Sequence, residues 1–178
     1  MRGKEFIMTK KFGVLTLIAV ILLGFPLQPV SAGKKKDMGG WEKDSEYNKH
    51  YDISEYESFK GWIKKIKTVT PLPGMSPGVA IEVCEDKKLN SEPILVHLCP
   101  AWFADPGTIG LKIGDRVKVK GAWAEIDDKD VFLASKVKKG DFYEFKARLS
   151  SDGTPFWTLS PEELAKERVA SQEALKKK

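Results

Sequence analysis

The chain has 178 residues, and its 30 Lys and Arg against 25 Asp and Glu give a formal net charge of +5 at pH 7. With two histidines and two cysteines in all, a catalytic triad, a multi-histidine metal centre or a covalently attached haem has little to draw on. The sequence also lacks G-x-S-x-G and a phosphate-binding glycine loop, so we expect no enzymatic activity and no cofactor.

The first 32 residues have the plan of a secretory signal peptide. Four basic residues precede an apolar run of 12 residues at 14–25, and the small residues Val30 and Ala32 precede Gly33. The run is short for a membrane span, so we expect cleavage after Ala32 and no stable span afterwards. An uncleaved N-terminal anchor is the alternative. The sequence thus predicts a periplasmic or secreted protein.

Removal of this peptide lowers the net positive charge of the chain. It would leave 26 basic and 24 acidic residues, and six of those basic residues form the lysine runs at 34–36 and 176–178. Between Trp41 and Leu175, 20 basic residues stand against 23 acidic ones, so the folded part is slightly negative. This balance makes nucleic acid an unlikely partner, although the pI of the whole chain is near 9.

Five segments follow one another along the chain. They are the signal peptide (1–32), a flexible linker (33–40), a strap anchored by Trp41, Tyr47 and Tyr51 (41–58), a β domain (59–157), and a helix with a basic tail (158–178). The helix should begin with a capping box, in which Ser160 and Glu163 bond each other's backbone amides.

Short runs rich in β-branched and aromatic residues, separated by turn residues, predict six strands. The expected ranges are 59–69, with a bulge or bend at Gly61, then 79–86, 94–103, 115–126, 131–141 and a last strand beginning at 142. Five consecutive strands with a longer third connection are typical of an OB-fold. We therefore predict a mainly β protein: a five-stranded Greek-key OB-fold barrel with an extra C-terminal strand, an N-terminal strap and a C-terminal helix.

The two cysteines lie in the second and third predicted strands. If the aliphatic residues of both strands point into the barrel, Cys84 and Cys99 share the outward face and lie directly opposite each other. An oxidising compartment then favours a disulfide. Two unpaired thiols, or a metal held by Cys84, His97 and Cys99 with Glu82 or Asp86, are the alternatives. For His97 itself, an exposed strand histidine is the simpler interpretation.

An OB-fold usually binds ligands on its second and third strands and on the loops 1–2 and 4–5. The candidate residues at those places are Met75, Glu82, Asp86, His97, Asp127, Asp128 and Asp130. Such an acidic groove suits a small cationic or polar ligand, or a protein partner, better than single-stranded nucleic acid. The simpler interpretation of the three aspartates is a solvated hairpin turn.

Two further groups of residues allow alternative interpretations. The tryptophans at strand ends, Trp102, Trp123 and Trp157, are expected to point inward and close the barrel. Basic residues alternate along the fourth and fifth strands at Arg116, Lys118, Lys120, Lys136 and Lys138. They form either a ladder for an anionic polymer or a solvated outer face, with Val117, Val119, Val131 and Leu133 pointing inward.

Six stretches also carry a family resemblance, and they run in the order YNKHYD, GWIKKIKTVTPLPGMSPGVAIEV, VHLCPAWF, LKIGDRVKVKGAW, VFLASKVKKGD and ARLSSDGTPFW. They resemble a group of uncharacterised exported bacterial OB-fold proteins and are similar, more distantly, to the periplasmic bacterial OB-fold (BOF) family. The resemblance implies a fold and a compartment, without an enzymatic activity or a cofactor. The chain departs from the group at Cys99, where glycine is usual, and at Phe103, where tyrosine is usual.

From these observations we predict an exported, non-catalytic OB-fold binding or interaction module whose ligand the sequence does not name. One alternative is an accessory protein of extracytoplasmic redox or metal systems, with a metal at Cys84, His97 and Cys99. The other is a binder of anionic polymers or nucleic acid that uses the fourth and fifth strands and the lysine runs.

Overall fold

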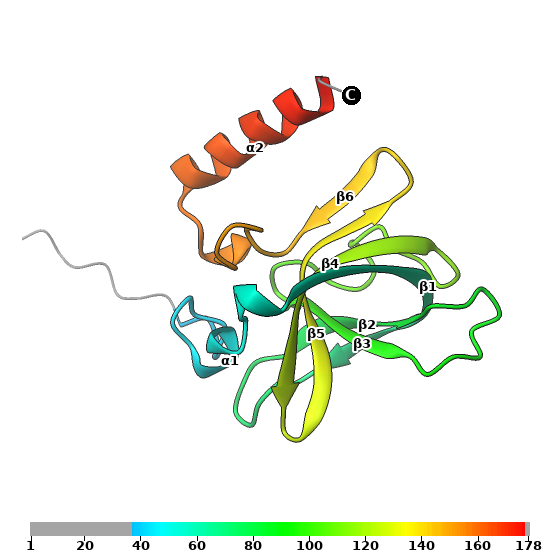
Figure 1. Ribbon diagram of the computed structural model, residues 1–178. Coiled ribbons are helices and arrows are strands. Elements are labelled where there is room, and N and C mark those ends of the chain that lie inside the picture. Colours follow the sequence, from blue (N-terminus) through cyan, green and yellow to red (C-terminus); the bar gives the residue numbers. More distant parts are fainter. Residues whose placement is uncertain (1–36, 177–178) are drawn as a thin grey trace, which may run out of the picture. The chain divides into compact units, whose positions relative to one another are not determined.

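A computed structural model describes residues 37–176 (Figure 1). The elements are α1 (Glu46–Lys49), η1 (Ile53–Glu55), β1 (Tyr56–Val69), β2 (Gly78–Cys84), β3 (Ile94–Pro100), β4 (Arg116–Ile126), β5 (Lys129–Lys139), β6 (Tyr143–Lys146), η2 (Phe156–Thr158) and α2 (Pro161–Lys176). The predicted signal peptide lies outside the described residues. None of the helices within 37–176 is long and apolar enough to cross a membrane.

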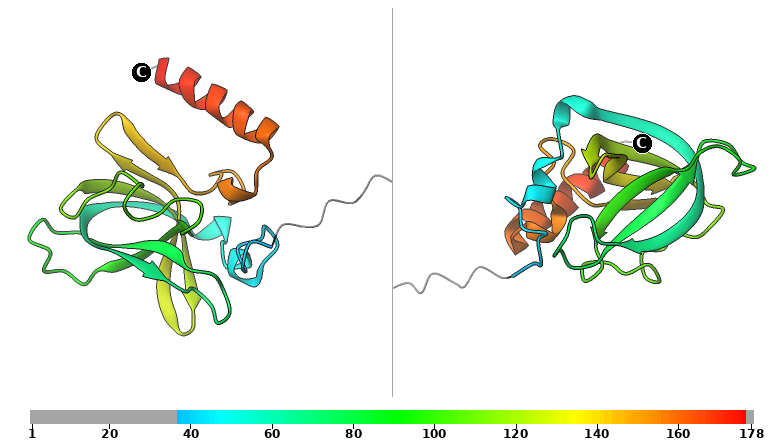
Figure 2. Two further views of the ribbon diagram at one scale, coloured as in Figure 1. Left: turned by 180° about the vertical axis from the view of Figure 1, so that it is seen from behind. Right: turned by 90° about the horizontal axis from the view of Figure 1, so that it is seen from below.

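Strand β1 holds the sheet together by pairing with two neighbours. Its first half pairs antiparallel with β4 and its second half with β2, and it curves strongly between them (Figure 2). The sheet order is β3-β2-β1-β4-β5-β6, and a parallel pairing of β3 with β5 at Val96–Phe132 and His97–Leu133 closes the first five strands into a ring. This is the predicted mainly β fold, with β6 as the extra strand.

Two glycines permit close approach of neighbouring backbones in this ring. A Cβ atom at Gly61 would collide with the carbonyl oxygen of Cys84, and one at Gly121 with the carbonyl oxygen of Leu133. Gly61 is therefore required for the close contact between β1 and β2. The register of β1 against β2 shifts between Ile63 and Lys65, so the bulge predicted at Gly61 lies further along the strand.

A second bulge changes which side chains of β5 share a side of the sheet. Lys120 pairs with Lys136 but Gly121 pairs with Ala134, so Ser135 is an extra residue in β5. Phe132 consequently packs edge-to-face on Phe59 and Trp123. Val131 and Leu133 are buried in the hydrophobic core cluster as expected, but they lie on the side of β5 opposite Phe132, because the bulge shifts the alternation in this half of the strand.

The strap is part of the core, as predicted for its aromatic residues. Trp41 and Tyr47 are buried, and the Trp41 ring packs edge-to-face on Tyr47 at 4.8 Å and on Trp157 at 5.6 Å. The Trp41 indole donates a hydrogen bond to the carbonyl of Ser76, and the Trp157 indole donates to the carbonyl of Trp41. These contacts connect the strap to the β1–β2 loop and to η2.

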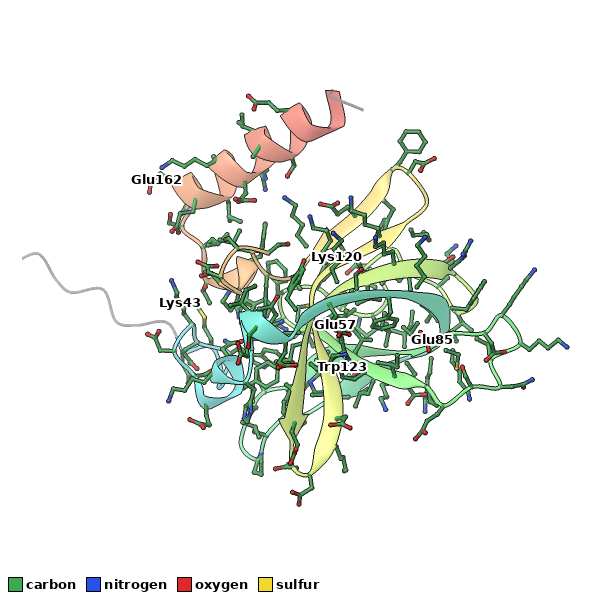
Figure 3. All side chains as sticks on the ribbon, viewed as in Figure 1. Lys43, Glu57, Glu85, Lys120, Trp123 and Glu162 are labelled. Atoms are coloured by element: carbon green, nitrogen blue, oxygen red, sulfur yellow. The ribbon has the colours of Figure 1, made fainter. Side chains whose placement is uncertain are left out.

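The three strand-end tryptophans have different environments. Trp157 is buried as predicted, and Trp123 is half-buried against Phe132 with its indole donating to Glu57 (Figure 3). Trp102 is 46% exposed, so the prediction that it closes the barrel is wrong. The reason is a turn after Pro100, to whose carbonyl the amides of Phe103 and Ala104 donate, which ends the strand alternation.

Helix α2 begins with the predicted capping box. The Glu163 amide donates to the Ser160 hydroxyl, and the Ser160 amide donates to the Glu163 carboxylate. The helix contacts β6 through Lys146, whose ammonium group donates to the Ser171 hydroxyl at 2.6 Å and lies 3.4 Å from Glu167.

Candidate functional site

The two cysteines are free, buried thiols near opposite ends of the β2–β3 pair. Cys99 lies opposite Val79, five positions along β2 from Cys84, which is roughly 16 Å at the rise of a strand. The predicted disulfide is therefore wrong. The error is one of register: Ile94 lies opposite Val83, whereas a Cys84–Cys99 pair requires the connection between the two strands to be centred at 91–92.

Each thiol has its own local hydrogen bond. Cys84 donates to the carbonyl of Ser91, and Cys99 donates to the carbonyl of Ala104. Burial raises the pKa of the Cys99 thiol to about 12, so it stays protonated at neutral pH. A protonated thiol far from Cys84 does not suit a shared ion. Within residues 37–176, moreover, no cluster of three or more His, Cys, Asp or Glu residues is placed to hold a metal.

His97 is 4% exposed, so the expectation of an exposed histidine is wrong. The strap covers it: the Tyr47 hydroxyl lies 3.3 Å from Nδ1, and the two rings lie 6.0 Å apart. Burial, and secondarily the positive charges of Arg148 and Lys67, lower the pKa of His97 to about 4. The imidazole is therefore neutral at pH 7.

Arg148, which the sequence analysis did not single out, is buried beside this histidine. Its guanidinium lies over the rings of Tyr47, Tyr51 and Trp157 at 5.1–5.7 Å and donates to Ala134 and Asn48. A lone arginine near the end of the β domain carries no sequence signal of such burial. It connects the strap, β5 and the C-terminal segment, and it keeps His97 in a positive environment.

Most acidic residues of the predicted groove instead stabilise the fold through ion pairs, hydrogen bonds within a loop, or a tight turn. Glu82 pairs with Lys67 at 2.6 Å. Asp86 accepts hydrogen bonds from the amides of the β2–β3 loop, and these bonds lower its pKa to about 2. Asp127 and Asp128 adopt positive φ angles of 51° and 56° in the tight β4–β5 turn, where Asp is tolerated.

Two further predicted site residues, Asp130 and Met75, are not among those that line the cleft described below. Asp130 is exposed and pairs with Glu125 in the hairpin. Met75 is half-buried and packs against the core, and its side chain would collide with a Cβ atom placed at Gly40 in the strap. Met75 therefore helps to hold the strap.

A cleft of about 160 Å³ lies between the β1–β2 loop and the β4–β5 hairpin, the two connections at which an OB-fold usually binds ligands. Its lining residues are Val69, Thr70, Pro71, Leu95, His97, Ile126, Asp127, Lys129 and Val131. They come from the end of β1 and the β1–β2 loop, from β3, and from the β4–β5 hairpin. Of the predicted site residues the cleft contains His97 and Asp127.

The sequence analysis missed the apolar residues of this cleft for a definite reason. Leu95 lies two residues before His97 on β3 and shares its side, whereas Val131 reaches the cleft because the Ser135 bulge shifts the alternation in the first half of β5. The proline-rich composition of the β1–β2 loop pointed to a loop at Pro71, but the bulge has no clear sequence signal.

The barrel matches a known family model. The model of the MamS/MamX magnetosome protein family matches residues 55–143, which is half of the chain and spans β1 to the first residue of β6. The chain belongs to the MamS/MamX magnetosome protein family. A comparison with curated proteins finds no match. The MamS/MamX assignment agrees with a bacterial family of the predicted kind and lends no support to the BOF similarity.

Proposed function

We propose that this MamS/MamX family member is an exported, non-catalytic binding module with an OB-type barrel, and that it serves an accessory role at the magnetosome. Its cleft over His97 would hold a polar ligand or one side chain of a protein partner. The observation that carries the proposal is the cleft itself, which lies between the β1–β2 and β4–β5 loops, where an OB-fold usually binds.

The size and chemistry of the cleft limit what it accepts. Its volume of about 160 Å³ corresponds to roughly five water molecules, the scale of one amino-acid side chain. The walls are largely aliphatic, which favours an apolar body. Asp127 and Lys129 stand together in the lining and carry opposite charges, so a polar group suits the cleft better than a strongly cationic one.

The state of His97 supports a binding role over a catalytic one. A general base works best when its pKa is near the working pH, and the pKa of His97 is lowered to about 4. Its Nδ1 atom also lies next to the buried Tyr47 hydroxyl. Export rests on the predicted signal peptide at 1–32, and the magnetosome setting rests on the family name.

The proposal is tested by methyl and imidazole NMR of the full chain titrated with N-acetyl amino-acid amides of apolar, polar and cationic types. We expect a polar amide with an aliphatic body to shift the signals of His97, Leu95 and Val131. Val69→Phe, which fills the cleft, should abolish those shifts, whereas Thr68→Phe at the exposed neighbouring position should not. Shifts that persist in Val69→Phe, or their absence with every amide, would refute the cleft as the site.

A further inference from the structure

Seven basic residues share one outer face of the sheet, on β1, β4, β5 and β6. We call this set the basic face: Lys60, Arg116, Lys118, Lys120, Lys136, Lys138 and Lys146. Residues directly opposite in antiparallel strands point to the same side. One row of the register therefore aligns Lys60, Lys118 and Lys138, and the next aligns Lys120, Lys136 and Lys146.

Such rows work against the stability of the sheet, since like charges directly opposite each other are destabilising. Two carboxylates compensate part of the charge. Glu144 bridges Lys136 at 3.4 Å and Lys138 at 2.7 Å, and Glu167 of α2 lies 3.4 Å from Lys146. In the described part of the chain, no salt bridge is formed by the remaining four, Lys60, Arg116, Lys118 and Lys120.

We propose that the basic face binds an acidic segment of a partner protein, laid in extended conformation across β1, β4 and β5. Glu144 shows how a carboxylate fits, because it sits between two lysines spaced two residues apart on one strand. Alternate residues of an extended chain are about 6.6–6.8 Å apart. Alternate carboxylates of an extended peptide therefore match the spacing of Lys118 and Lys120.

Other polyanions fit this face less well. Single-stranded nucleic acid needs exposed rings for stacking. Two aromatic residues share this side of β1, Trp62 and Tyr56. The Arg116 guanidinium already lies over the Trp62 ring at 5.2 Å, and the Tyr56 hydroxyl lies 3.3 Å from the Ser135 hydroxyl, so both already have partners within the protein. A flat anionic membrane would meet α2, whose Ser171 hydroxyl accepts a hydrogen bond from Lys146 of the basic face. A narrow peptide avoids both difficulties.

The basic face is independent of the cleft over His97. The cleft is lined from the β1–β2 loop, β3 and the β4–β5 hairpin, and no residue of the basic face is among its lining residues. Either surface can therefore bind a partner without the other, and the two proposals are tested separately.

The test uses the full chain and a fluorescein-labelled peptide of about ten glutamates, with binding followed by fluorescence anisotropy at low and at physiological ionic strength. The face variant combines Lys118→Gln and Lys120→Gln. The matched control combines Lys87→Gln and Lys88→Gln, which remove the same charge from exposed positions of the β2–β3 loop. We expect the face variant to bind at least about fivefold more weakly and the control to change by less than about twofold.

Thermal unfolding of both variants shows whether the fold is kept. The face variant should melt no lower than the unmodified chain, because it removes lysines that face other lysines. Equal weakening in the two variants would overturn the proposal in favour of general charge attraction. Tighter binding of labelled oligothymidine, or of vesicles containing phosphatidylglycerol, would overturn it in favour of those partners. Absence of peptide binding at low ionic strength would overturn it outright.

Discussion

Replacing Trp41 with alanine should remove a large share of the stability of this protein, although Trp41 lies outside the barrel strands. The side chain is completely buried, it packs on Tyr47 and Trp157, and its indole donates to Ser76 at 2.9 Å. Emptying a buried tryptophan site costs about 3–5 kcal/mol, and the carbonyl of Ser76 loses its donor as well. We expect a loss of about 4 kcal/mol in the free energy of unfolding.

Trp102→Ala is the matched control, because it deletes the same side chain at a site that is 46% exposed. We expect it to cost about 1 kcal/mol, since roughly half of its surface is already in water. Urea unfolding followed by far-UV circular dichroism measures both, because the change in tryptophan content does not disturb that signal. A loss below about 1 kcal/mol for Trp41→Ala, or a larger loss for Trp102→Ala, would refute the account of the strap as part of the core.

Three other outcomes follow from buried or crowded groups. The pKa of His97 in the folded state is about 4, below its ordinary 6.5, so the unfolded chain takes up the proton first as the pH falls. The free energy of unfolding should therefore be at its full value above about pH 6.5 and decline by at most roughly 3 kcal/mol towards pH 4. His97→Gln should flatten this slope, as measured by urea midpoints across the same pH range. Cys84 and Cys99 should resist a thiol reagent in the native protein and both react in urea, whereas reaction of neither in urea without reductant would restore the disulfide. Gly61→Ala should cost more than about 2 kcal/mol by thermal unfolding, because its Cβ would collide with the Cys84 carbonyl; an unchanged melting temperature would show that the strands can separate there.

The order of the strands was predictable because the turns between them have clear sequence signals. The pairing of residues between strands was not, as the β2–β3 register and the bulge in β5 show. Asp86 accepts hydrogen bonds from amides of the β2–β3 loop, and beyond this loop Ile94 pairs with Val83, a register that the sequence did not indicate and that separates Cys84 from Cys99. Nothing in the sequence marks Ser135 as a bulge, yet that residue is an extra one in β5. The first error separates Cys84 from Cys99 along the β2–β3 pair. The second changes which residues of β5 share a side, since a bulge of one residue shifts the alternation of every neighbour beyond it.

Tyr47 of the strap and Arg148, which lie near His97, are outside the part of the chain that matches the family model. The family match begins at residue 55 and ends at 143, so Trp41, Tyr47 and Arg148 all lie outside it. Two of them lie near His97: Tyr47 contacts its ring, and Arg148 lies over Tyr47.

The matched barrel therefore supplies the floor of the cleft, while segments on both sides of the match cover the adjoining part of the same face. Burial is the main cause of the low pKa of His97, and the strap contributes to that burial through Tyr47, so a ligand of the proposed cleft would meet a neutral imidazole. The selectivity of this cleft would accordingly depend on the strap and on Arg148 as much as on the barrel strands.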